Sequence, residues 1–139
     1  MAAQKYLTQF SKHVLDEIFP KARTDRFFEA LLGDASEGAF DIVLTYSGES
    51  ENRIIFEFQL NQRPGKCLAC NLTYGLPEVF ARHPVIDIVG VVQQIDLRMT
   101  NGKRCGKWQI GRTKEISRER HVLPLVIELI SGDSAQPED

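Results

Sequence analysis

A chain of 139 residues is most simply one domain, because that length suffices to bury a single hydrophobic core. Hydrophobic residues make up 42% and charged residues 26%, which is close to the average for soluble globular chains. The formal net charge of -2 argues against a nucleic-acid binder with a strongly basic surface, and every apolar run is too short to span a bilayer.

The N-terminal sequence predicts the compartment of the protein. Charged side chains at Lys5, Lys12 and Asp16 interrupt its apolar residues, which excludes the apolar stretch of a signal peptide. The three cysteines are an odd number, and without a secretory signal they indicate free thiols in a reducing compartment. We therefore expect a cytoplasmic protein that makes no membrane contact.

The first third of the chain predicts two amphipathic helices. Apolar side chains recur at four-residue spacing in the first one: Tyr6, Phe10, Val14 and Ile18. Phe19-Pro20 should end this helix. We expect Thr24 or Asp25 to cap the next helix, and Gly33 stands where a C-terminal cap is expected. Neither helix can bury its apolar stripe alone, so both should cover another element.

From residue 40 the apolar period changes to two, which predicts antiparallel strands with one buried face. The segments 40–46 and 54–60 both alternate in this way, and the loop 47–52 turns the chain between them. Pro64-Gly65 marks a second turn. A five-residue loop there pairs apolar residues throughout: Leu60 with Leu68, Phe58 with Cys70, Phe56 with Leu72 and Ile54 with Tyr74.

The second half of the chain predicts further strands. Residues 84–99 are rich in β-branched side chains, and Asn101-Gly102 is a strong hairpin signal that would place Ile95 opposite Trp108. Residues 122–130 favour a strand, although Pro124 could also begin a short helix. The acidic segment 132–139 is expected to be a disordered tail.

These elements predict an α+β domain over residues 1–131. Two N-terminal helices would pack on an antiparallel sheet of about five or six strands. If the second hairpin forms, Cys70 points into the core and Cys67 to the opposite face, so the two cysteines could share neither a metal ion nor a disulfide.

A zinc site is the alternative interpretation of the Cys-x-x-Cys segment. Its candidate ligands resemble those of a two-cysteine, two-histidine finger: Cys67, Cys70 and His83. Asp87 stands in place of the last histidine, and Cys105 is a possible fourth ligand. Pro84 opposes this hypothesis, because it would break the helix that must carry the final two ligands. A redox role is less favoured, since redox pairs sit at a helix N-terminus.

A second candidate contact surface lies in the basic C-terminal third. It combines an aromatic ring with three cations: Trp108, Arg104, Lys107 and Arg112. Such a group could contact a ligand or partner, and single-stranded nucleic acid would need this combination. The alternative is a buried Trp108 beside solvated cations that protect a sheet edge. The overall charge favours the second interpretation and makes nucleic acid an unlikely partner.

No nucleophile, base and orienting group come together in the sequence. We therefore expect a non-enzymatic binding or protein-interaction module without a cofactor, its partner an unidentified protein or small molecule. A homodimer through a sheet edge or the helical face is also possible. The third hypothesis is a small-molecule or enzymatic pocket between helices and sheet, lined by aromatic side chains: Phe28, Phe56, Phe58 and Trp108. Such side chains more often fill a core.

The segment "RPGKCLACNLTYGLPEVFARHP", residues 63–84, carries a resemblance that extends over much of the chain. It resembles a group of small uncharacterised bacterial proteins, from sulfate-reducing organisms among others. The resemblance implies a cytoplasmic bacterial protein, and it implies no activity.

Overall fold

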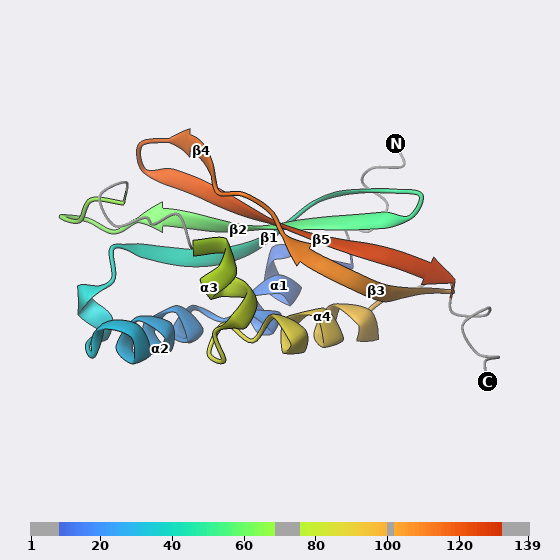
Figure 1. The fold of residues 1–139 in the computed structure, drawn as a ribbon, viewed down its shortest axis with the longest axis horizontal. Helices are drawn as coiled ribbons and strands as arrows, with labels where there is room; N and C mark the ends of the chain where they lie inside the picture. Colours follow the sequence, from blue (N-terminus) through green and yellow to red (C-terminus); the bar gives the residue numbers. More distant parts are fainter. Residues whose placement is uncertain (1–8, 69–75, 100–101, 132–139) are drawn as a thin grey trace.

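The computed structural model describes residues 9–68, 76–99 and 102–131. Within these residues, helices cover one face of a five-stranded antiparallel sheet, as Figure 1 shows. The α-helices are α1 (Lys12–Ile18), α2 (Lys21–Leu32), α3 (Leu76–Arg82) and α4 (Ile88–Leu97). The α+β class and the antiparallel sheet predicted from the sequence are confirmed. None of the described helices is long and apolar enough to cross a membrane.

Helix α1 begins later than the apolar pattern predicted, and α2 begins earlier. Ser11 caps α1, so Phe10 lies before the helix, and Tyr6 lies outside the described residues. The predicted break at Phe19-Pro20 is confirmed. The predicted caps of α2 are wrong, because Pro20 is its N-cap residue and Thr24 is buried inside the helix. Gly33 ends α2 in the left-handed conformation, with φ 87°, as predicted.

The sheet has the strand order β1-β2-β5-β3, and β4 also pairs with β5. Its strands are β1 (Phe40–Ser50), β2 (Arg53–Gln62), β3 (Lys103–Ile110), β4 (Lys114–Ser117) and β5 (Arg120–Ser131). The predicted strands at 40–46, 54–60 and 122–130 are confirmed. Strand β4 was not predicted. A short 3-10 helix, η2 (Ala35–Glu37), joins α2 to β1.

The predicted hairpin after Pro64-Gly65 is wrong. Strand β2 lies between β1 and β5, so both of its edges already carry hydrogen-bonded partners. Leu60 pairs with Ile42 and His121 instead of with Leu68. The other predicted partners, residues 70, 72 and 74, lie outside the described residues. Alternation had identified the buried face of β2 correctly, but it does not specify which strand pairs with it.

The strand predicted over residues 84–99 is also wrong, because its centre forms α4. The buried side chains of this helix recur at helical spacing: Ile88, Val91, Val92 and Ile95. The carboxylate of Asp87 caps the helix by accepting a hydrogen bond from Gly90 N at 3.1 Å. The predicted pair of Ile95 with Trp108 therefore does not form, and Trp108 pairs with Ile127 of β5.

The core between helices and sheet is rich in phenylalanine. Phe56 and Phe58 point from β2 into this layer and are fully buried. Phe58 meets Phe80 of α3 edge-to-face at 5.5 Å, and Phe10 meets Phe56 in the same way at 5.1 Å. Phe28 of α2 is buried as well. These side chains belong to the hydrophobic core.

Candidate ligand-binding groove

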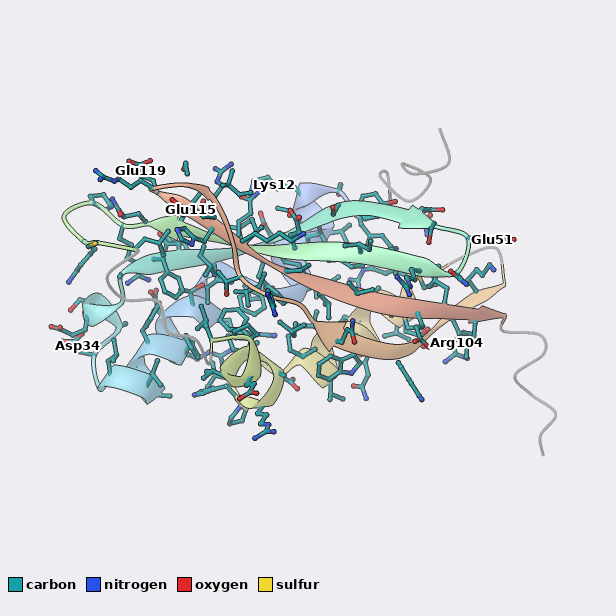
Figure 2. The ribbon with its side chains drawn as sticks, turned by 45° about the horizontal axis from the view of Figure 1, so that its top comes forward. Lys12, Asp34, Glu51, Arg104, Glu115 and Glu119 are labelled. Carbon is teal, nitrogen blue, oxygen red and sulfur yellow. The ribbon has the colours of Figure 1, made fainter. Side chains whose placement is uncertain are left out.

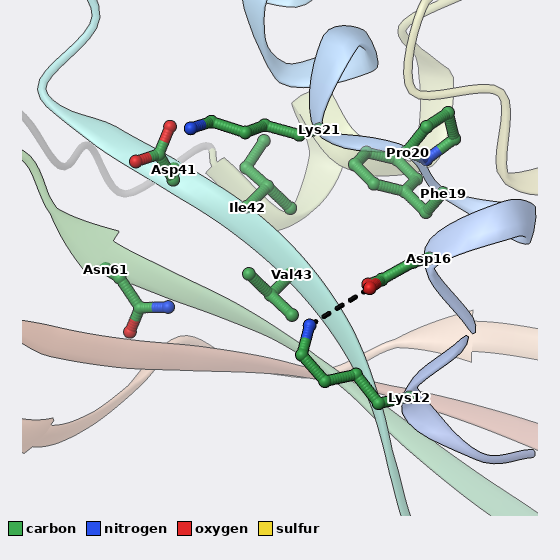
Figure 3. Close-up of a pocket in the computed structure, with 9 residues that line it drawn as sticks. All are labelled: Lys12, Asp16, Phe19, Pro20, Lys21, Asp41, Ile42, Val43 and Asn61. Carbon is green, nitrogen blue, oxygen red and sulfur yellow. Dashed lines mark hydrogen bonds and ion pairs between the residues drawn. The ribbon is translucent and has the colours of Figure 1, made fainter. Parts of the chain in front are cut away.

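A groove of about 520 Å³ opens between the α1–α2 junction and the outer edge of β1 (Figure 3). Its lining combines charged groups, an amide and an apolar floor: Lys12, Asp16, Phe19, Pro20, Lys21, Asp41, Ile42, Val43 and Asn61. The volume falls within the range of roughly 300–1,000 Å³ that small-molecule sites occupy. The groove is therefore a candidate ligand site.

The wall of the groove is positioned by a contact between α2 and β1. The Thr24 hydroxyl accepts a hydrogen bond from Ile42 N at 3.3 Å and donates one to Ile42 O at 3.4 Å. Thr24 and Ile42 are both buried, so the two hydrogen bonds form in a site that excludes water. They hold the first turns of α2, and with them Pro20 and Lys21, against the strand.

Arg63 positions one end of the groove by holding Asp41. Its Nε donates to Asp41 Oδ1 at 3.1 Å, and its Nη2 donates to Asp25 Oδ1 at 2.9 Å. Its Nη1 donates to the backbone oxygens of Ala35 at 2.8 Å and of Gly38 at 3.3 Å. The Arg63 side chain is only 15% exposed. The Asp41 carboxylate is thus held in place by a nearly buried guanidinium.

The opposite end carries an exposed ion pair. Lys12 Nζ lies 3.0 Å from Asp16 Oδ2, and the two side chains are 80% and 49% exposed. An exposed pair of this kind contributes about 0–1 kcal/mol, because water and salt screen it. A charged ligand could therefore replace either partner at little cost in free energy.

Two further donors face the groove. Lys21 makes no hydrogen bond or ion pair with the described residues, and its ammonium group lies toward Asp41 in Figure 3. Asn61 Oδ1 accepts a hydrogen bond from Arg120 Nε at 2.8 Å, and its amide nitrogen points toward the groove in the same view. Lys21 and Asn61 can thus both donate hydrogen bonds to an anionic group.

Of the three proposed zinc ligands, the described residues include Cys67 and His83. Cys67 is disulfide-bonded, which contradicts the expected free thiol and leaves no thiolate to bind a metal ion in this state. Cys70 lies outside the described residues. His83 packs on Phe27 at 4.9 Å between ring centroids, and its Nδ1 accepts from Val85 N at 3.1 Å. Within the described ranges, no three histidine, cysteine or acidic side chains cluster as metal ligands.

The helix that a zinc finger would need is interrupted, as Pro84 predicts. Helix α3 ends at Arg82 and α4 begins at Ile88, so His83 and Asp87 lie in the connection between two helices. Cys105 is a free thiol on β3. Burial, followed by the negative charge of Asp96, raises the pKa of Cys105 to about 12.

The second sequence-predicted surface divides into buried and exposed parts. The Trp108 ring is half-buried against the core, and Arg104 Nη2 donates to Asp96 Oδ2 at 2.8 Å. Lys107 and Arg112 are exposed. Trp108 and Arg104 thus have structural contacts, while Lys107 and Arg112 remain accessible.

His121 is a buried polar residue at the start of β5. Only 8% of this residue is exposed, and its Nε2 has no hydrogen-bond partner within the described structure. The core-facing register of β5 places it there, opposite Leu60. His13 is exposed, and its Nε2 lies 3.2 Å from Glu17 Oε2.

Sequence reasoning did not identify the groove. Its residues come from α1, the start of α2, β1 and the end of β2, and they form no local motif. Only the packing of α2 on β1 brings Lys21 and Asn61 to one cavity.

Comparison with known proteins adds no family: no family model, no curated protein and no solved structure matches this chain.

Proposed function

We propose that this protein is a binding module and that the groove beside β1 holds its ligand. The ligand would be a small zwitterion, such as an α-amino acid or a short peptide. The observation that carries the proposal is the charge distribution of the groove, which offers both signs around an apolar floor. This proposal combines two hypotheses from the sequence. One is a non-enzymatic binding module, and the other is a small-molecule site between helices and sheet.

The carboxylate of the ligand would lie at the end of the groove near Lys21. Asp41 at this end is already engaged by Arg63, whereas Lys21 and the Asn61 amide have donors to offer. A charged donor makes a stronger hydrogen bond to a carboxylate than a neutral one does. The ammonium group, which in an amino acid is bonded to the same carbon as the carboxylate, would point toward Asp16, whose pair with Lys12 is exposed and easily exchanged.

The floor of the groove would contact an apolar side chain of the ligand. Ile42 and Val43 lie between the two charged ends in Figure 3, and Phe19 and Pro20 form the facing wall. A site of this kind gains affinity from apolar burial and specificity from a few polar groups. An amino acid with a branched aliphatic side chain therefore fits both parts of the lining.

The first experiment is a binding titration with L-leucine. Calorimetry measures the binding, and the shift of the thermal unfolding temperature measures the stabilisation of the protein. At about a hundredfold excess over Kd, a ligand that binds only the folded state stabilises it by about 2.7 kcal/mol. Val43→Trp should fill the groove and abolish binding. The matched control is Ile55→Trp, which places the same side chain on the same sheet face outside the groove lining and should bind leucine normally.

Two altered probes test the orientation. Leucinamide lacks the carboxylate, and N-acetylleucine lacks the ammonium group. The wild type should prefer leucine over both. Lys21→Ala should remove the preference for leucine over leucinamide while the preference over N-acetylleucine persists. Equal binding of leucine by the wild type and Val43→Trp would exclude this groove as the site.

A further inference from the structure

A separate surface lies along the opposite edge of the sheet. Residues 103–120 contain seven lysine and arginine residues but only two glutamates, in a chain whose net charge is -2. Strands β3 and β4 both pair with β5 on the side away from β2, so they form one edge together. The hydrogen bond from Gly111 N to Pro124 O, at 2.9 Å, keeps the connection between them along β5.

Most of these cations have no structural partner. Arg104 is bound to Asp96, and Arg120 donates to Asn61. Four exposed cations make no hydrogen bond or ion pair with other described residues, and we call them the basic edge: Lys107, Arg112, Lys114 and Arg118. In Figure 2, Arg104 lies toward one end of this edge, and Glu115 and Glu119 lie at the other. Unpaired charges of one sign favour a partner of the opposite sign.

An apolar residue lies among these cations. Ile116 of β4 is 61% exposed and stands in the sequence between Lys114 and Arg118. It also borders a second groove, of about 300 Å³, together with Asn61 and Arg120. An exposed aliphatic side chain at a groove, surrounded by charge, provides the apolar centre and polar rim that protein interfaces combine.

We propose that the basic edge binds an acidic segment of a partner protein. The carboxylates of that segment would pair with Lys107, Arg112 and Lys114, and one of its apolar side chains would enter the groove beside Ile116. Recognition would rest on side chains. The backbone N–H of Cys105 on β3 is occupied by Asp96 Oδ1 at 2.8 Å, so at this residue an added strand would find no free donor.

Single-stranded nucleic acid fits this surface less well. It binds by stacking its bases on exposed aromatic rings as well as by charge. The Trp108 ring is half-buried against the core, and no other aromatic side chain occurs between residues 102 and 120. The exposed Ile116 instead matches an apolar protein side chain.

The test uses fluorescence anisotropy with a labelled short peptide of aspartate and glutamate residues around one leucine. The combined variant Lys107→Glu, Arg112→Glu and Lys114→Glu should weaken binding by about tenfold or more, because each reversal replaces an attraction to the acidic peptide with a repulsion. The matched control reverses three exposed cations elsewhere: Arg26→Glu, Arg53→Glu and Arg82→Glu. It changes the net charge equally and should weaken binding by only about twofold.

A second variant separates the apolar contact from the charge. The wild type should prefer the leucine peptide to one with serine in its place, and Ile116→Ser should lose that preference. The proposal is overturned if the two triple variants weaken binding equally. It is also overturned if a single-stranded oligonucleotide binds the wild type more tightly than the peptide does, and if the triple variant of the basic edge weakens the binding of that oligonucleotide.

Discussion

The Thr24 hydroxyl bonds both the backbone N–H and the backbone C=O of Ile42, so a helix side chain occupies the outer edge of β1. The groups of Ile42 that point away from β2 would otherwise be open to another strand. At the opposite edge of the sheet, Asp96 of α4 accepts a hydrogen bond from the backbone N–H of Cys105 on β3. Each outer strand is thus protected at one residue by a helix side chain, a known defence against edge-to-edge aggregation.

Thr24→Val should destabilise the protein by about 1–3 kcal/mol, because it leaves two buried backbone groups of Ile42 without partners. Valine has nearly the same shape as threonine, so packing changes little. Thr24→Ser keeps the hydroxyl and should cost less. Urea denaturation of the three proteins measures the difference. Equal stability of the valine and serine variants would contradict this role of the hydroxyl.

Arg63→Lys should destabilise the protein far more than Asp25→Asn. Arg63 joins α2, η2 and β1 through its fork of donors, and a lysine cannot reach the same partners. Asp25 is half-exposed and contributes only one of these contacts. We expect a loss of about 3–5 kcal/mol for Arg63→Lys and less than about 1 kcal/mol for Asp25→Asn. Comparable losses in denaturant titrations would show that the remaining contacts of Arg63 contribute little.

Asp96 should make stability depend on pH. The hydrogen bond from Arg104, and then that from Cys105 N, lower the pKa of Asp96 in the folded state. A lowered pKa stabilises the fold above the unfolded-state value of about 3.9, and this stabilisation is lost as the pH falls through the folded-state pKa. Asp96→Asn should therefore be less stable than the wild type at pH 7. Their unfolding free energies should converge on acidification, and a constant difference down to about pH 2 would contradict the assignment.

Cys105 should resist alkylation in the folded protein. Burial raises its pKa to about 12, so almost no thiolate exists at pH 8 to react. Iodoacetamide treatment followed by mass spectrometry should show modification of Cys105 only after denaturant is added. Rapid modification of Cys105 in the native protein would mean that β3 opens readily or that the thiol is accessible.

The elements predicted correctly are those with a clear local pattern. Burial alternates along residues 40–45 of β1 and 53–61 of β2, and Gly33 ends α2 because a left-handed residue is needed there. The strand prediction for residues 88–97 was wrong because it relied on their β-branched side chains. The spacing of Ile88, Val92 and Ile95 suits a helix. The spacing was the better guide.

The other errors are non-local. Apolar alternation in β2 predicts a buried face, but it cannot predict that β5, some sixty residues later, pairs with it in place of the segment after Pro64-Gly65. The groove has the same origin, since Lys21 and Asn61 meet only after α2 has packed on β1. The basic edge was visible in the sequence as a run of cations, but the structure was needed to separate the paired Arg104 from the unpaired Lys107.

An NMR titration of isotopically labelled protein with L-leucine and dialanine will show whether the groove beside β1 is a ligand site. If the groove binds these ligands, backbone amide signals of residues 12–21, 41–43 and 61 should shift and reach saturation in the wild type, and none of these shifts should occur in Val43→Trp. Shifts confined to other surfaces, or no saturable shift with either probe, would contradict this proposal.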